Sequence, residues 1–72
     1  MVKVKLADSQ YTKFIIYIAL LLEEKVLPQE ARDHHLKGDW HGYREFHLGG
    51  DMLLIYLLTD ESLILVRIGT HA

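Results

Sequence analysis

The 72-residue sequence contains no cysteine and only one proline. Without cysteine the chain has neither a disulfide nor a thiolate ligand for a metal, so neither can stabilise a small fold. A domain of this length buries only about 60% of the surface that its unfolded chain exposes. We therefore predict a single domain over residues 1–72. Its stability is marginal, and a binding partner would increase that stability.

Long apolar runs and a recognisable secretory signal are also missing. The longest uncharged apolar run, Phe14–Leu22, covers nine residues, about half of the roughly 20 that an α-helix needs to cross a bilayer. Near the start of the chain, Lys3, Lys5 and Asp8 interrupt the apolar stretch that a signal peptide requires. The sequence thus predicts no membrane association and a cytoplasmic location.

An excess of positive charge, which is typical of proteins that bind nucleic acid through its phosphates, is absent as well. Eight basic residues against ten acidic ones give a formal net charge of −2. Histidine, by contrast, is frequent: four of the five histidines lie between His34 and His47. Each adds positive charge when protonated. The histidines are therefore what a functional hypothesis has to explain.

Hydrophobic periodicity divides the chain into one helical segment and several alternating ones. Tyr11–Lys25 repeats apolar residues at helical spacing without glycine or proline, which predicts one α-helix. Residues 29–42 are polar and rich in histidine, so we expect a loop with at most one helical turn. Together the segments predict an α+β domain, with the helix on one face of a small antiparallel meander of three or four strands. The predicted strands are Met1–Leu6, Tyr43–Leu48, Met52–Leu58 and Leu63–Ile68.

The predicted helix has more apolar surface than one sheet face can bury. Asp8 or Ser9 is the expected N-cap and Leu27-Pro28 the expected stop. The surplus predicts a surface that a partner covers. The stripe expected to face the sheet contains Tyr11, Phe14, Ile18, Leu21 and Leu22, and the surplus residues are Ile15, Ile16, Tyr17 and Leu20.

Alternation along the strands brings together groups that suit RNA cleavage. It places Tyr43, Glu45 and His47 on one face of their strand, so His47 need not lie in the core. It also places Arg67 with His71 on one face of the last strand, if the extended path continues that far. If the loop at His34 reaches the same surface, an imidazole pair and a guanidinium share one groove. Metal-free RNA cleavage needs a base for the ribose 2′-hydroxyl, an acid for the leaving 5′-oxygen and a cation for the charged phosphorane.

Other interpretations of these residues stay open. Histidines spread over a small domain are more often surface residues than catalysts, and for His35 and His41 we favour a solvated loop. Asp51 is most simply a turn residue, and Arg44 is more often half of a surface ion pair. A structural zinc site stays open but is not indicated, because the turn at Gly49-Gly50 breaks the helix that would put His47 and Asp51 on one face.

The order of residues over about the last 45 positions resembles the signature of the YafQ branch of RelE-type bacterial toxins. Leu27-Pro28 and the helix before it are also similar to the segment that precedes this signature. The residues that carry the resemblance are Arg32-Asp33-His34, Leu36-Lys37-Gly38, Trp40, Gly42-Tyr43-Arg44-Glu45, His47, Asp51, Leu54-Ile55-Tyr56, Arg67 and Gly69-Thr70-His71.

The resemblance implies a fold, an activity and a partner. The implied fold is a small sheet with helices on one side, and the implied protein is the toxin of a type II toxin-antitoxin system, held silent by an antitoxin. Its implied activity is cleavage of messenger RNA in the ribosomal A site, without metal or cofactor. In that activity His71 is the general acid, and Asp51 or His47 lies near the 2′-hydroxyl. The implied catalytic residues are His34, His47, Asp51 and His71, and the implied phosphate-binding residues are Lys37, Arg44 and Arg67.

The sequence departs from the family pattern in three places. About ten residues stand where members usually have a strand and a further helix, Ala72 stands where they continue to an aromatic residue, and Met52 stands where tryptophan is common. A missing first helix would leave the apolar surplus of Tyr11–Lys25 uncovered, which predicts a homodimer through this helix and an antitoxin that competes for it. The alternative function is a catalytically silent module of the same fold that binds the antitoxin or itself.

Overall fold

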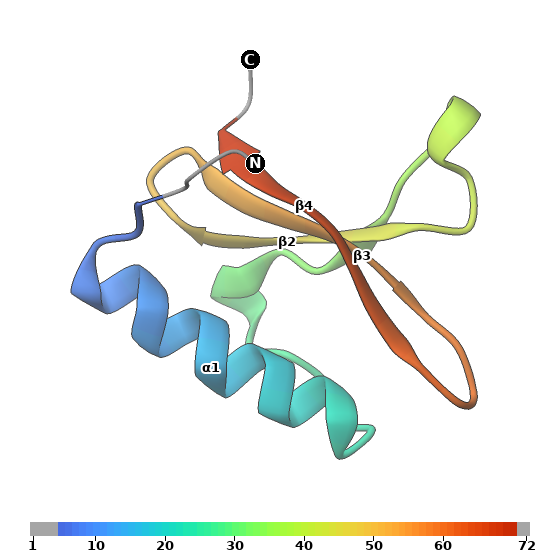
Figure 1. The fold of residues 1–72 in the computed structure, drawn as a ribbon, viewed down its shortest axis with the longest axis horizontal. Helices are drawn as coiled ribbons and strands as arrows, with labels where there is room; N and C mark the ends of the chain where they lie inside the picture. The colour runs from blue at the N-terminus through green and yellow to red at the C-terminus, as the bar shows by residue number, and fades with distance from the viewer. Residues whose placement is uncertain (1–4, 71–72) are drawn as a thin grey trace.

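The computed structural model describes residues 5–70, which form one α-helix and a four-stranded antiparallel sheet (Figure 1). The strands follow one another in the order β1-β2-β3-β4, and the helix lies along one side of the sheet. The predicted α+β fold is confirmed. The elements are α1 (Asp8–Leu22), η1 (Gln29–Ala31), β1 (His34–His35), η2 (Gly38–Trp40), β2 (Arg44–Gly49), β3 (Met52–Leu58) and β4 (Leu63–Thr70), where η marks a single 3₁₀ turn.

Helix α1 begins three residues before the predicted start. Its cap is Ala7, which has extended backbone angles and donates its N–H to the side-chain oxygen of Gln10 at 2.9 Å. The predicted cap residue Asp8 lies instead in the first turn, where its negative charge is favourable near the positive end of the helix dipole. The predicted strand Met1–Leu6 falls mostly on residues 1–4, which lie outside the described residues.

The helix also ends earlier than predicted, well before Pro28. Glu24 takes a left-handed conformation with φ of 59°. The N–H of Lys25 donates to Leu20 O at 2.9 Å, and that of Glu24 donates to Leu21 O at 3.1 Å. These two bonds form a Schellman motif, which satisfies the last carbonyls and turns the chain away. Backbone hydrogen bonding, and not the proline, therefore ends the helix.

The segment 29–42, predicted as a loop, contributes an edge strand. Strand β1 consists of His34 and His35, which pair with Glu45 and Arg44 of β2. A backbone bond from Leu36 N to Tyr43 O at 2.9 Å extends this pairing. Two residues are too few to show a period of two in the sequence. The three longer strands lie within two residues of their predicted bounds.

The hydrophobic core lies between α1 and one face of β2 and β3. Tyr17 is buried and meets Phe46 edge to face, with ring centroids 5.5 Å apart. Tyr17 was predicted to belong to the surplus apolar face, and this prediction was wrong. Leu20 is also partly buried against the core. The buried core residues are Leu6, Tyr17, Leu21, Leu27, Ala31, Phe46, Leu48, Leu54 and Tyr56.

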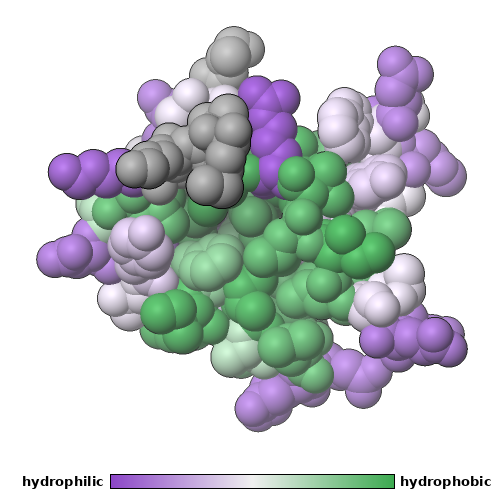
Figure 2. All heavy atoms as spheres, viewed as in Figure 1, coloured by the Kyte–Doolittle hydropathy of each residue, from purple (hydrophilic) through white to green (hydrophobic). Residues whose placement is uncertain are grey.

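One helix cannot cover four strands, so part of the sheet face remains open. Helix α1 packs on β2, and between α1 and β4 a pocket of about 190 Å³ is lined by residues of α1, β3 and β4. Figure 2 shows apolar side chains gathered over the face where Figure 1 places α1 and β4. We call this region the α1–β4 groove. Its residues are Phe14, Leu54, Leu65, Val66, Arg67 and Ile68, and exposed Tyr11, Ile15 and Leu22 lie on the flank of α1 beside Phe14 and Ile18.

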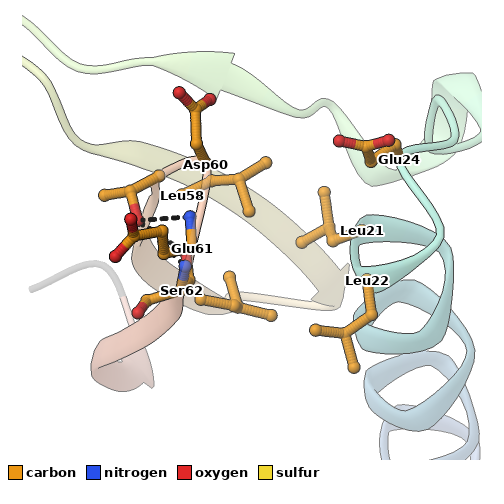
Figure 3. A pocket seen from close by; sticks show the side chains of 9 residues that line it. Leu21, Leu22, Glu24, Leu58, Asp60, Glu61 and Ser62 are labelled. Carbon is orange, nitrogen blue, oxygen red and sulfur yellow. Dashed lines mark hydrogen bonds between the residues drawn. The ribbon is translucent and has the colours of Figure 1, made fainter.

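A second pocket, of about 340 Å³, lies between the end of α1 and the β3–β4 turn (Figure 3). Leu21 and Leu58 face each other across it, while Glu24 and Asp60 lie at its rim. Thr59 shapes the turn by accepting a hydrogen bond from the Ser62 N–H at 2.9 Å. No helix within residues 5–70 is long and apolar enough to span a membrane.

Candidate functional site

A row of side chains crosses the sheet on the face away from α1. The register pairs His34 with Glu45, Glu45 with Ile55, and Ile55 with Arg67. Directly opposite residues of paired strands share a face, so these four side chains line up from β1 to β4. The neighbouring row contains His47, Leu53 and Gly69.

Glu45 lies between two imidazoles in these rows. Its Oε1 is 3.3 Å from Nε2 of His47 and 3.7 Å from Nε2 of His34. The two imidazole rings are 6.1 Å apart and inclined by 30°. Strand β2 places Glu45 and His47 on one face because they are two residues apart, and β1 adds His34 because it is the cross-strand partner of Glu45. We call these three residues the histidine–glutamate cluster.

Within the cluster, the Glu45 carboxylate is buried and the His34 imidazole is exposed to solvent. The side chain of Glu45 is 7% exposed, that of His47 is 19% exposed and that of His34 is 50% exposed. A buried carboxylate is costly unless cations or hydrogen-bond donors stand near it. Protonated imidazoles supply this charge. The carboxylate of Glu45 therefore lies buried beside an imidazole, that of His34, which reaches solvent.

The backbone orients His34. Its Nδ1 lies 2.5 Å from the carbonyl oxygen of Arg32, a residue in the left-handed conformation with φ of 51°. When Nδ1 carries the proton of this hydrogen bond, Nε2 of the neutral ring is the acceptor nitrogen. That nitrogen is the one that faces Glu45.

A separate polar network lies on the opposite face, under the edge of the core. The carboxylate of Asp33 forms an ion pair with Arg44 and accepts a hydrogen bond from the Tyr56 hydroxyl. The guanidinium of Arg44 also lies over the Tyr56 ring, 5.6 Å from its centroid. Burial raises the pKa of Tyr56, and the bond to Asp33 raises it further. The network anchors the segment that leads into β1.

The structure thus brings some predicted site residues together and separates others. His34 and His47 meet in the cluster, and Arg67 shares a row with Glu45. Arg44 is an ion-pair partner of Asp33 on the other face, which argues against its predicted contact with RNA phosphates. Lys37 is exposed before η2, Asp51 is exposed in the β2–β3 turn, and His71 lies outside the described residues.

Glu45 is the site residue that the sequence did not single out. Alternation did place it on the face of His47, and a charged residue in the middle of an apolar strand signals a function when its neighbours on that face are also polar. Its second neighbour, His34, was not predictable as a strand residue. Each of the three side chains offers one atom that could bind a metal, and these atoms all lie within 4.8 Å of one another.

Known proteins are similar to this chain in sequence and in fold. The mRNA interferase toxin YafQ of Escherichia coli K12 is 44% identical over 73 residues, which cover 96% of this chain and 79% of that protein. The E. coli DinJ–YafQ complex contains a chain that superposes with a TM-score of 0.74 and 40% identity, over 85% of this chain and 69% of that one.

A copper-bound mutant toxin from Helicobacter pylori superposes with a TM-score of 0.73 and 33% identity, over 99% of this chain and 96% of that one. The family described as the bacterial toxin of type II toxin-antitoxin system, YafQ, matches residues 1–72. This chain belongs to the YafQ family of type II toxin-antitoxin toxins.

Proposed function

We propose that this protein is an mRNA interferase that cleaves messenger RNA in the ribosomal A site, with the histidine–glutamate cluster at the centre of its active site. The observation that carries the proposal is a buried carboxylate between two imidazoles, in one row with an arginine. The name of the E. coli relative, an mRNA interferase toxin, supports the same activity. Acid–base chemistry at this face needs no metal or cofactor.

The proposed chemistry is a transesterification within the RNA, in which the phosphoryl group passes from the 5′-oxygen to the 2′-oxygen. A basic group of the cluster, Glu45 or His47, takes the proton of the ribose 2′-hydroxyl, and the resulting oxygen attacks the adjacent phosphorus. The bond to the 5′-oxygen breaks, and an acid gives that oxygen a proton. Arg67, in the same row as Glu45, stabilises the charge on the phosphorane.

The other predicted residues keep proposed roles around this centre. His71, which lies outside the described residues, remains the proposed general acid on the strength of the family resemblance. Asp51 is proposed to help at the 2′-hydroxyl from the neighbouring turn. Lys37, exposed in the loop before η2, is proposed to contact RNA phosphate.

An antitoxin is the proposed partner, as DinJ is for YafQ in the E. coli complex. The α1–β4 groove is the proposed surface, because exposed Ile15, Leu22 and Leu65 border it. Burial of such side chains is worth roughly 1.5–3 kcal/mol each. A substrate on the ribosome places the protein in the cytoplasm.

The same groove supports a second candidate function, a catalytically silent module that binds the antitoxin or a second copy of itself. The supporting observation is the exposure of large apolar groups such as Tyr11 and Ile15, at 49% and 64%. A chain with this function would bind its partner and leave messenger RNA intact.

Cleavage by purified protein separates the two candidates. Ribosomes programmed with a defined messenger RNA are incubated with the wild type or with Glu45→Gln, His47→Gln or His71→Ala, and cuts are mapped by primer extension. We expect the wild type to cut in the A site and each variant to lose at least about 100-fold in rate, the lower end of acid–base contributions.

His41→Gln is the matched control, because His41 is an exposed loop histidine outside the cluster. It should cut at the wild-type rate. Circular dichroism of each variant shows whether the fold is retained. A folded wild type that leaves the RNA intact would favour the silent module, and a folded Glu45→Gln variant with full activity would remove the cluster from the mechanism.

A further inference from the structure

Three potential metal ligands meet in the histidine–glutamate cluster. The separations from Glu45 Oε1 to His47 Nε2 and to His34 Nε2 are 3.3 and 3.7 Å. Ligands held at about 2.0–2.2 Å around a tetrahedral zinc ion lie roughly 3.3–3.6 Å from one another. The remaining separation, between the two imidazoles, is within 4.8 Å. The separation from Glu45 to His47 falls within the tetrahedral range, and the separation from Glu45 to His34 lies just above it.

The protein already holds His34 as a metal ligand is usually held. Histidines that bind metals through one ring nitrogen commonly donate the other N–H to a backbone carbonyl or a carboxylate, which fixes the tautomer and the ring. Nδ1 of His34 makes this contact with the Arg32 carbonyl at 2.5 Å, and Nε2 is the nitrogen in the cluster.

The remaining two ligands are held by a strand in the sheet. Glu45 and His47 belong to β2, which is hydrogen-bonded to β1 on one side and to β3 on the other. A cation at this point also offsets the cost of keeping the Glu45 carboxylate away from water. Two imidazoles and one carboxylate form a donor set that leaves the fourth tetrahedral position open to water.

We propose that His34, Glu45 and His47 bind one Zn²⁺ ion, and that the bound ion is an off state of the toxin. Imidazole suits Zn²⁺ and Cu²⁺, whereas Mg²⁺ prefers a shell of oxygens and water. The off state rests on the proposed function: the ion occupies the lone pairs that would accept the ribose proton. Zinc binding itself does not depend on the activity.

Calorimetric titration of the untagged full chain with Zn²⁺ tests the binding. We expect one ion per chain, a higher melting temperature in the zinc-bound protein, and no binding heat with Mg²⁺. His34→Gln and Glu45→Gln should each weaken zinc binding by more than about tenfold. Loss of a group that only hydrogen-bonds to a metal ligand already costs about tenfold in affinity, so loss of a ligand should cost more.

His41→Gln should bind zinc as the wild type does. Absence of stoichiometric binding would overturn the proposal, and so would equal affinity in the wild type and in folded His34→Gln, whose exposed position keeps the substitution clear of the core.

Ribosomal cleavage tests the off state in a separate arm. Zinc at a concentration that fills the site should slow cleavage by at least about 100-fold, and a zinc-selective chelator should restore it. Full activity of the zinc-bound protein would overturn the off state. A wild type that cleaves nothing even after chelation would contradict the proposed function, while the calorimetric result would still decide on the site.

Discussion

At the scale of single residues, Asp33 connects the segment before β1 with two strands of the sheet. Its carboxylate is bound by Arg44 from β2 and by the hydroxyl of Tyr56 from β3. Asp33 directly precedes His34, so the contacts that fix Asp33 also fix the start of β1. The side chains of Asp33 and Arg44 are 12% and 29% exposed, which shields their attraction from water and salt.

We predict that Asp33→Asn lowers the free energy of unfolding by about 1–3 kcal/mol, because a partly buried guanidinium loses its counter-charge. Urea unfolding followed by circular dichroism measures the change. Glu23→Gln is the matched control: its ion pair with Lys25 is 60% and 64% exposed, and exposed pairs contribute roughly 0–1 kcal/mol. Equal effects of the two substitutions would show that the network of Asp33 does not stabilise the fold.

Part of the candidate site was predictable because strand alternation has a fixed period. Alternation put Glu45 and His47 on one face, away from Phe46 and Leu48, and the structure confirms this. The role of Glu45 went unrecognised because its neighbour on that face, His34, is brought by a strand of two residues. The backbone turn at Arg32 that aims His34 has no sequence preference behind it, since arginine rarely takes a positive φ.

At the scale of elements, the end of α1 carries an unfavourable residue. Glu24 occupies the left-handed position of a Schellman motif, which glycine fills at no steric cost. This is also why the helix end was predicted several residues too late: glutamate favours helix continuation, and the proline at position 28 was the visible stop signal.

We predict that Glu24→Gly raises the free energy of unfolding by about 0.5–1.5 kcal/mol, since it relieves the strained φ while it keeps the capping bonds. Chemical denaturation measures the gain. Glu23→Gly provides the contrast, because Glu23 has φ of −90° and no strain to relieve. That variant should be no more stable than the wild type. A loss of stability in Glu24→Gly would mean that the glutamate side chain makes a contact that matters more than its backbone angle.

Strands β2, β3 and β4 were predicted better than the helix bounds because each of the three has at least six residues, enough to show its period. The bulge in β4 was not predictable. The register moves from Ile55–Arg67 to Tyr56–Leu65, so Val66 is an extra residue. Without this bulge Arg67 and Leu65 would share a face; with it, Arg67 joins the row of Glu45 and Leu65 turns to the α1–β4 groove.

At the scale of the whole molecule, two buried tyrosines make the stability of the fold depend on pH in the alkaline range. Burial raises the pKa of both Tyr56 and Tyr17, and the carboxylates of Asp33 and Glu30 add to the respective shifts. A phenol whose pKa is raised in the folded state contributes stability that is fully present below its unfolded pKa of about 10. This stability is lost as the pH rises through the folded pKa.

We therefore predict that the free energy of unfolding falls above pH 10, by up to about 1.4 kcal/mol per pH unit for each tyrosine. Urea midpoints between pH 8 and about 11 record the slope, since the range brackets the reference pKa of tyrosine. Tyr56→Phe removes one titrating group and should flatten the curve, while Tyr11→Phe, on an exposed tyrosine, should leave its shape unchanged. An unchanged slope in Tyr56→Phe would contradict the coupling.

The partly covered sheet face leaves apolar side chains of α1 and β4 exposed. Surplus apolar surface was predicted on the helix alone, whereas the structure distributes it over α1 and β4. Helical spacing puts Ile15 on the groove flank and Ile16 on the opposite flank beside Leu20. We expect the isolated chain to self-associate through the groove, with an antitoxin as competitor, because burying several such side chains at roughly 1.5–3 kcal/mol each outweighs leaving them in water.

Sedimentation velocity at micromolar concentration decides the question. An Ile15→Glu, Leu65→Glu double variant should be monomeric and folded, since both positions are exposed and a charge there reaches solvent in the monomer. Ile16→Glu is the matched control on the same helix, 48% exposed but on the other flank, and it should associate as the wild type does. A wild type that stays monomeric would leave the groove to the antitoxin, and association lost only in Ile16→Glu would place the contact on the opposite flank of α1.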